Sequence, residues 1–267
     1  MLTVSPACVK CGICAEVCPI GIISLDQGVP KLTAPAACVR CGHCVAACPH
    51  AALDHSKAPL AGQVPLGDAP VLDAATAARF LRSRRSVRRY RTEAVPSDTL
   101  LKLLDIARFA PTGGNTQGLS YLVVGDRELM KKITATVIDW IEQQASEGVA
   151  WVRPYARIAS VYRTTGYDVV LRDAPHLIVA LAPKNFAIGE KNTRYSLAYA
   201  ELYAPSLGLG TCWAGFFEMC AFAAYPELYE LLAIPENMTI TGAIMAGYPV
   251  YRYQRLVDRD PLKVDWR

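Results

Sequence analysis

The sequence contains CVKCGICAEVCP at residues 8–19 and CVRCGHCVAACP at residues 38–49. Each run places cysteine at its first, fourth, seventh and eleventh positions and then ends in proline. Eight of the ten cysteines in this 267-residue chain lie in the two runs. Closely spaced cysteines in a chain without an export signal usually bind metal and do not pair as disulfides, so the repeat predicts a metal-binding module.

The spacing C-x-x-C-x-x-C-x-x-x-C-P, similar to that of bacterial two-cluster ferredoxins, indicates iron–sulfur clusters. In this signature the fourth cysteine of each run ligates the cluster of the other run. The expected ligands of the two [4Fe–4S] clusters are Cys8, Cys11, Cys14 and Cys48 for the first, and Cys38, Cys41, Cys44 and Cys18 for the second. The alternative is a pair of structural zinc sites, although zinc modules usually pair two C-x-x-C knuckles. We expect His43 and His50 to surround or tune the second cluster.

Residues 1–55 resemble ferredoxin domains. This resemblance implies two short strand-and-helix units related by a pseudo-twofold axis, with cluster binding supplying much of the folding energy. Residues 56–72 are rich in proline and show no periodic apolar face, which predicts a linker. A larger domain follows at 73–267.

Apolar periodicity in the larger domain predicts helices that alternate with strands. We expect Asp73 to cap a helix over 74–81 and Ser97 to cap a helix that Pro111 stops. The other expected elements are helices near 127–147 and 193–207 and strands at 121–124, 177–182 and 239–246. This alternation indicates an α/β or α+β domain.

The run RSRRSVRRYR at residues 82–91 carries six arginines in ten residues. Read alone, it is typical of a surface for nucleic acid or anionic membrane. The net charge is only +4, however, from 28 Lys and Arg against 24 Asp and Glu, so the basic run is a local concentration. Other stretches that suit an anion or ring site are APTGGNTQ at 110–117, GLGTCWAG at 208–215 and GYP at 247–249.

In their order and content these stretches resemble the FMN-dependent nitroreductase family across residues 75–267. The whole chain resembles ferredoxin–nitroreductase fusions. The family implies an α+β fold, with a mixed sheet flanked by helices, and a homodimer with FMN at the subunit interface. The resemblance assigns the flavin phosphate to Arg84 and Ser86, a place beside the ring or ribityl chain to Arg85, a further contact to Arg88, and a second phosphate clamp to Arg255 and Arg259.

The same resemblance places the isoalloxazine ring against a second set of residues. This set is Pro111, Thr112, Gly113, Asn115 and Gln117, together with backbone N–H groups of Ala214 and Gly215 near flavin N5. Such amides would stabilise the electron-rich reduced ring. Gly118 and Leu119 stand where the family typically has Pro-Trp, which alters the surroundings of the ring. We expect Cys212 to be a buried structural thiol in preference to a reactive one.

These assignments imply a reductase that receives single electrons through the clusters and reduces a nitroaromatic or quinone-type small molecule on FMN. Ferredoxin or NAD(P)H would be the electron donor. One alternative is an NAD(P)H-oxidising flavoprotein that exports electrons through its clusters to a ferredoxin. Another is a non-catalytic electron-transfer or redox-sensing module.

The sequence favours neither nucleic acid nor membrane as a partner. No stretch approaches the roughly 18 apolar residues of a membrane span. The motif that opens at Cys8 also leaves no room for a cleavable apolar signal. We therefore expect a cytoplasmic protein.

Overall fold

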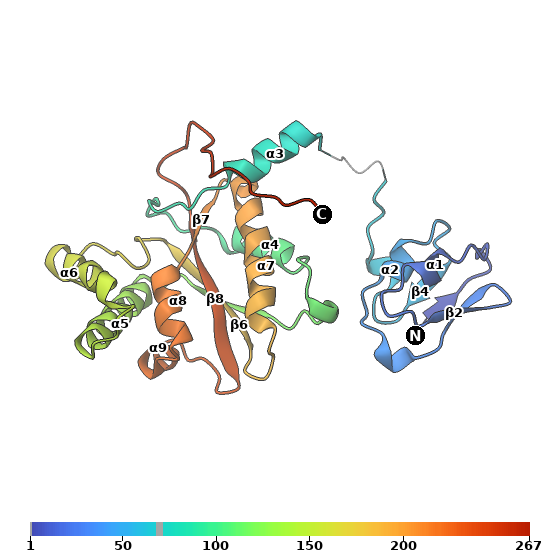
Figure 1. Cartoon of the computed structure of the whole chain (residues 1–267), viewed down its shortest axis with the longest axis horizontal. Helices are drawn as coiled ribbons and strands as arrows, with labels where there is room; N and C mark the ends of the chain where they lie inside the picture. Colours follow the sequence, from blue (N-terminus) through green and yellow to red (C-terminus); the bar gives the residue numbers. More distant parts are fainter. Residues whose placement is uncertain (1, 68–71) are drawn as a thin grey trace. The chain divides into compact units, whose positions relative to one another are not determined.

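The computed structural model of the protein describes residues 2–67 and 72–267. The chain divides into two compact units (Figure 1). The first contains the residues up to 71 together with 113–116, and the second contains 72–112 and 117–267. Within the expected linker, residues 68–71 lie outside the described residues, and Leu60–Gly62 forms a 3-10 turn, η2. No helix in the described ranges is both long and apolar enough to span a membrane.

The first unit repeats a short strand-and-helix arrangement, as the cysteine repeat predicts. Its principal elements are β1 (Leu2–Val4), α1 (Ile13–Glu16), β2 (Ile23–Asp26), β3 (Val29–Leu32), η1 (Pro35–Ala37), α2 (His43–Ala46) and β4 (Leu53–His55). The strands pair antiparallel as β1 with β4 and β2 with β3. Gly12 and Gly42 precede the two helices at φ +82° and +73°, a left-handed conformation that glycine adopts without strain. The third cysteine of each run is thereby placed in the first turn of a helix.

The second unit is an α+β domain with helices on both faces of a sheet (Figure 1). Its elements are α3 (Ala74–Ser83), α4 (Ser97–Ala107), β5 (Ser120–Val124), α5 (Arg127–Ser146), η4 (Arg153–Tyr155), α6 (Ala156–Thr165), β6 (His176–Pro183), α7 (Gly189–Tyr203), η5 (Ala204–Leu207), β7 (Gly210–Trp213), α8 (Gly215–Phe222), α9 (Pro226–Leu231) and β8 (Met238–Gly247). The 3-10 turn η3 (Gly113–Asn115), between α4 and β5 in sequence, groups with the first unit. The strand order is β5-β6-β8-β7, and these pairs are antiparallel. Ser86 forms an isolated parallel bridge with Thr211 at the β7 edge, outside the named strands.

Side chains of β6 divide between two cores because successive strand residues point to opposite faces. Leu177 and Val179 pack into the core beneath α5 and α8. Ile178 and Ala180 pack into the core beneath α4 and α7. All four are fully buried, so this strand is apolar on both faces, as a central strand covered by helices must be.

Several expected boundaries are confirmed and others are corrected. Asp73 caps α3, because its carboxylate accepts from the backbone N–H groups of Ala75 and Thr76 at 3.0 Å. Ser97 does not cap α4, since it is already the first helical residue and Pro96 holds the cap position. The stretch 208–215, for which no strand was predicted, contains strand β7 and the first residue of α8. Pairing of β7 with β8 explains this difference, because that pairing is a long-range interaction.

Candidate cofactor sites

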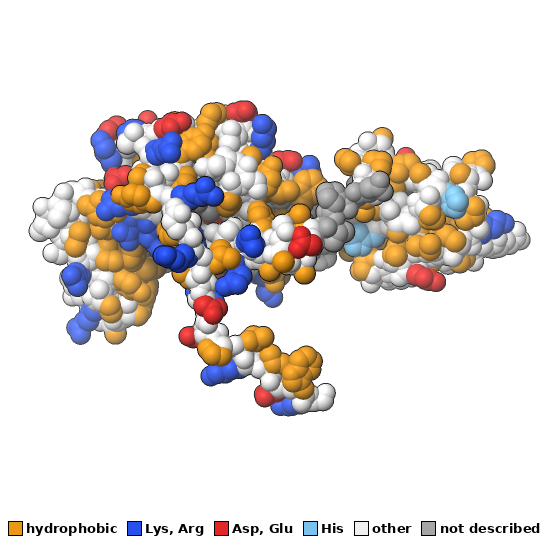
Figure 2. Space-filling model, turned by 90° about the horizontal axis from the view of Figure 1, so that it is seen from above, with side chains coloured by type: hydrophobic (Ala, Val, Ile, Leu, Met, Phe, Trp, Pro, Cys, Tyr) orange, Lys and Arg blue, Asp and Glu red, His pale blue; other side chains and the backbone are white. Residues whose placement is uncertain are grey.

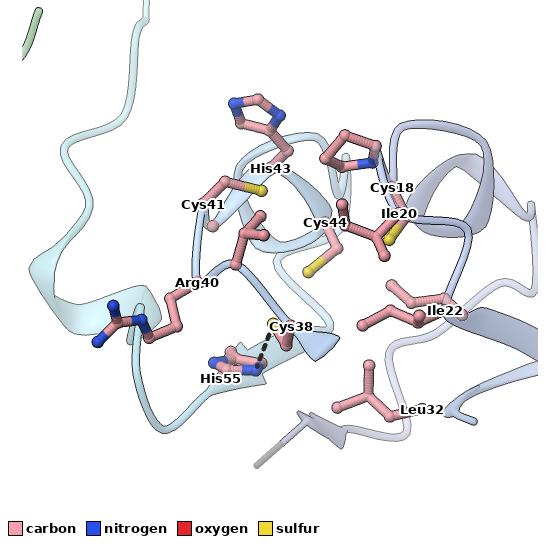
Figure 3. A pocket seen from close by; sticks show the side chains of 14 residues that line it. Cys18, Ile20, Ile22, Leu32, Cys38, Arg40, Cys41, His43, Cys44 and His55 are labelled. Carbon is pink, nitrogen blue, oxygen red and sulfur yellow. Dashed lines mark hydrogen bonds between the residues drawn. The ribbon is translucent and has the colours of Figure 1, made fainter. Parts of the chain in front are cut away.

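The first unit contains two cavities, each lined by four cysteines. One is lined by Cys8, Cys11, Cys14 and Cys48, and the other by Cys18, Cys38, Cys41 and Cys44. The fold thus brings together both sets that the spacing predicts, including the exchange of the fourth cysteine between runs. Figure 3 shows the four cysteines of the second cavity around a common space. A cubane binds one thiolate at each of four irons, so this donor set fits a [4Fe–4S] cluster.

Backbone N–H groups stabilise negative charge on the exchanged sulfurs. Burial acts to raise the pKa of Cys18, but surrounding backbone donors outweigh it and hold that pKa below the ordinary thiol value; these donors are Ile22, Ile20, Gly21 and Ile23. Ala52 N–H donates to Cys48 Sγ at 3.3 Å. Cys14 and Cys44 differ, because burial raises the pKa of both thiols. Metal binding requires the thiolate, and the amides favour that form at Cys18.

A third histidine, His55, lies against the second cavity and has no place in the cysteine motif. Its side chain is buried at 3% exposure, and its Nε2 lies 3.7 Å from Cys38 Sγ (Figure 3). Burial lowers the pKa of the imidazole. His43 is exposed and lines the same cavity, as expected. His50, also exposed, was expected at the second cavity but lines the first. The one signal that could have pointed to His55 as a cavity residue is its position at the end of strand β4.

The second unit contains a pocket that we call the arginine pocket. It is lined by Ser83, Arg84, Arg85, Val87, Arg91, Glu201, Pro205, Gly208, Leu209, Gly210, Thr211, Pro249, Val250, Tyr251, Arg252 and Tyr253. Strand-like bonding holds its basic wall in place, because Val87 N–H donates to Thr211 O at 2.9 Å and Arg91 N–H donates to Tyr248 O at 2.8 Å. Basic side chains also gather on one face of this unit in Figure 2. The arginine run therefore lies along the sheet edge and faces a pocket.

Glu201 is a buried carboxylate in the wall of the arginine pocket. Its Oε1 lies 3.5 Å from Arg84 Nη1 and accepts from Thr211 Oγ1 at 3.3 Å, while its Oε2 accepts from Trp213 Nε1 at 2.7 Å. Burial raises the pKa of Glu201, although Arg84 and the two hydrogen bonds oppose the shift. Sequence reasoning missed this residue because a single glutamate in an amphipathic helix normally faces solvent. Its contacts depend on how α7 crosses β7.

The structure brings only part of the predicted phosphate site to the arginine pocket. Arg84 and Arg85 line it, and half-buried Ser86 lies beside it on the bridge to Thr211. Exposed Arg88 donates to Ser86 O at 3.4 Å. Arg255 and Arg259 lie in the exposed C-terminal segment and do not line the pocket. Two other arginines line it, namely Arg91 and Arg252.

The predicted ring-binding residues lie in two other segments. Pro111 precedes a loop that is closed by a hydrogen bond from Gln117 N–H to Thr112 Oγ1 at 3.1 Å. Gly113 and Asn115, within this loop, group with the first unit. Ala214 N–H already donates to Ala243 O at 2.9 Å. Gly215 is the first residue of α8, a position whose N–H has no acceptor within the helix.

Cys212 is buried, as the sequence predicts. It is 4% exposed, and its Sγ donates to Trp213 O at 3.4 Å. Burial raises its pKa, an effect that Arg88 and Ser86 only partly oppose. A thiol that is kept protonated in this way is a poor nucleophile.

Two family models match the chain. The Nitroreductase family model matches residues 81–248, and the 4Fe-4S dicluster domain model matches residues 7–53.

Individual proteins give the same picture for the second unit. A protein from Archaeoglobus fulgidus, provisionally named NADH dehydrogenase/NAD(P)H nitroreductase, is 27% identical over 173 residues, covering 64% of this chain and 84% of that protein. Iodotyrosine deiodinase from Nematostella vectensis is 24% identical over 203 residues, covering 74% and 76%. The solved structure of a Bacteroides fragilis nitroreductase with bound FMN has a TM-score of 0.57 at 18% identity, covering 71% of this chain and 98% of that chain. At that identity the likeness shows a shared fold.

Proposed function

Because this chain belongs to the Nitroreductase family, a family of oxidoreductases, we propose that it is an FMN-dependent reductase fed by two [4Fe–4S] clusters. Its acceptor would be a small nitroaromatic or quinone-type molecule. The observation that carries this proposal is the presence in one chain of two four-cysteine cavities and an arginine pocket in a domain of that family. These sites suit, respectively, the relay of electrons and the binding of a phosphate-bearing flavin.

In this proposal each group of residues has a distinct role. The eight cysteines hold the clusters, Arg84 and Ser86 bind the flavin phosphate, and Arg85 lies beside the ring or ribityl chain. A guanidinium fork can donate two hydrogen bonds to one phosphate, and a hydroxyl can add a third. The N–H of Gly215 would stabilise negative charge on the flavin ring. When bound, the clusters would relay single electrons and FMN would deliver electron pairs to the acceptor.

The proposed assembly is a cytoplasmic homodimer with FMN at its interface. Large apolar side chains on and beside α4 and α7 remain exposed in the single chain, including Leu101 at 66% and Phe109 at 58%. A partner subunit would remove them from water. A cytoplasmic location suits eight cysteines that must stay reduced to bind iron. Light scattering coupled to gel filtration would contradict the dimer if it gave the mass of one chain.

The decisive experiment is anaerobic purification followed by counts of iron, sulfide and released FMN. The proposal predicts about eight iron atoms and one FMN per chain. Arg84→Ala should lower FMN occupancy, whereas Arg82→Ala is the matched control, because Arg82 is exposed and does not line the arginine pocket. Full FMN occupancy in Arg84→Ala would contradict the phosphate assignment. Zinc in place of iron would contradict the cluster assignment.

Electron flow in the opposite direction is the second candidate, favoured by the name of the Archaeoglobus fulgidus relative. There NAD(P)H would reduce FMN, and the clusters would export electrons to a ferredoxin. Stopped-flow spectroscopy under argon separates the two directions. Faster bleaching of the flavin by NAD(P)H than by reduced ferredoxin would favour export. Acceptors should then be compared across nitroaromatics, quinones and iodotyrosine.

Two non-enzymatic readings have their own tests. A redox module without catalysis would release no FMN on denaturation. A nucleic-acid-binding protein would bind DNA in a salt-dependent manner even when loaded with flavin. We expect no such binding, because the arginines of the pocket would already contact a phosphate.

A further inference from the structure

The orientation of the His55 ring follows from its backbone surroundings. His55 ends β4, and the turn that follows brings Lys57 N–H to His55 Nδ1 at 3.1 Å. A nitrogen that accepts a hydrogen bond carries a lone pair, so the proton of the neutral ring is on Nε2. Nε2 is the atom that lies 3.7 Å from Cys38 Sγ (Figure 3). The geometry thus makes His55 the donor and the cysteine sulfur the acceptor.

The carboxylate of Asp54 restrains the same turn. Its Oδ1 accepts from His55 N–H at 2.7 Å and from Leu60 N–H at 2.8 Å. Hydrogen bonds therefore hold the backbone on both sides of the His55 side chain, and the residue is 3% exposed. A buried donor fixed in this way directs its N–H at the sulfur without competition from bulk water.

The two halves of the first unit differ at this position. The offset of 30 residues between the cysteine runs makes Leu25 in β2 the counterpart of His55 in β4. Leucine has no hydrogen-bond donor in its side chain, and Leu25 is 44% exposed. The first cavity therefore lacks an equivalent donor at the repeated position.

We propose that His55 donates an N–H···S hydrogen bond to Cys38 and thereby raises the reduction potential of the second cluster above that of the first. This inference rests on the proposed binding of a cluster by Cys18, Cys38, Cys41 and Cys44. One-electron reduction of a [4Fe–4S] cluster adds one negative charge, part of which is carried by the cysteine sulfurs. A donor directed at such a sulfur stabilises the reduced form more than the oxidised form. His55 is a positioning residue, and the electron would reside preferentially on the second cluster.

The test is a mediated potentiometric titration of the full-length, anaerobically prepared protein, with the reduced clusters followed by electron paramagnetic resonance. His55→Leu copies the first repeat and should bring the two potentials together. At a fixed potential it should lower the reduced-to-oxidised ratio of one cluster about tenfold, which is about 59 mV for a one-electron couple. His55→Gln keeps an N–H donor at similar reach and should retain most of the separation.

His43→Leu is the matched control, since His43 lines the same cavity but is exposed. Because its side chain is exposed, His43→Leu should shift the potential of the second cluster much less than His55→Leu does. Unchanged potentials in His55→Leu, or an equal shift in His43→Leu, would overturn the proposal. If wild-type protein lacks about eight iron atoms, the cluster assignment itself fails; with eight iron present, the titration tests His55 alone.

A second measurement covers the case in which His55→Leu does not assemble its clusters. Protein carrying His43→Leu and His50→Leu can be labelled with ¹⁵N-histidine and examined by pulsed magnetic resonance after reduction. A hyperfine coupling from histidine nitrogen to a reduced cluster is then expected from His55. Absence of that coupling would refute the hydrogen bond in a protein that retains His55.

Discussion

Gly210→Ala tests whether the sheet edge positions the arginine pocket. A Cβ at position 210 would lie 2.5 Å from Val87 Cγ2 and 2.9 Å from Val87 Cβ. Ordinary carbon contacts are about 3.5–4.0 Å, so the strand and the arginine run must move apart by about 1 Å. Val87 is buried and β-branched and cannot turn away freely. Overpacking of this kind destabilises a core by about 1–3 kcal/mol.

The same displacement should weaken FMN binding. Val87 N–H donates to Thr211 O at 2.9 Å, and this bond places Arg84 and Arg85 at the pocket. Lengthening it should raise the FMN dissociation constant about tenfold, equivalent to about 1.4 kcal/mol. Both effects should be partly reversed in the double variant Gly210→Ala/Val87→Ala, which removes both methyl groups that the added Cβ would meet and leaves the contact with Cβ of residue 87.

The four tryptophans of the chain make the stability assay specific. All of them lie beyond residue 139, so tryptophan fluorescence in a urea titration reports unfolding of the second unit. Gly215→Ala is the control for stability, because no atom lies within 4 Å of the added Cβ and its φ is not positive. That control should leave the free energy of unfolding unchanged or slightly higher. If Gly210→Ala changes neither the free energy of unfolding beyond this control nor the FMN affinity relative to the wild-type protein, the close approach of Val87 is not what positions the arginines.

Three further predictions concern single side chains of the second unit. Asp126→Ala should lower the free energy of unfolding by about 1 kcal/mol in urea titrations, because its carboxylate caps the first turn of α5, and Asp126→Asn should restore most of the loss. Glu201→Ala should lower the free energy of unfolding by about 2–3 kcal/mol, since it removes a buried carboxylate and leaves Nε1 of half-buried Trp213 without its acceptor. An equal loss in Glu201→Gln, which keeps an acceptor oxygen, would argue against this reason. Burial lowers the pKa of His176 below 6.5, so the unfolded chain binds more protons at this residue as the pH falls through 6.5. In urea titrations, the free energy of unfolding should therefore decrease as the pH is lowered from 7.5 to 5.5. His176 contributes at most about 1.4 kcal/mol per pH unit to this decrease, so the decrease should be smaller in His176→Gln.

Local regularities were readable in the sequence because they depend on neighbouring residues. The cap at Asp73 and the apolar strand around Ile178 follow from local hydrogen bonding and burial, and both are confirmed. The start of α7 at Gly189 and the strand β7 were not found, because their residues have no distinctive periodicity. Pairing with β8 defines β7, and that partner lies more than 25 residues away in sequence.

The candidate sites divide in the same way. The cysteine sets could be assigned from spacing, since a cubane dictates short intervals between three thiolates and the repeat supplies the fourth. His55 lies outside the cysteine runs and reaches Cys38 only because the turn after β4 orients its ring. Arg91 and Arg252 line the arginine pocket through the pairing of the arginine run with the chain beyond β8. No interval in the sequence encodes that pairing.

The sequence by itself therefore determined which atoms are available for chemistry: eight thiolates in two interlocking sets and a local excess of guanidinium groups. Only the tertiary structure decided their surroundings, such as the buried carboxylate of Glu201 beside Arg84 and the imidazole of His55 beside Cys38. Metal-ligand spacing is short and is set by covalent geometry along the chain. The charge and hydrogen bonds around a ligand come from elements far apart in sequence, and packing of the two cores and pairing at the sheet edge bring those elements together.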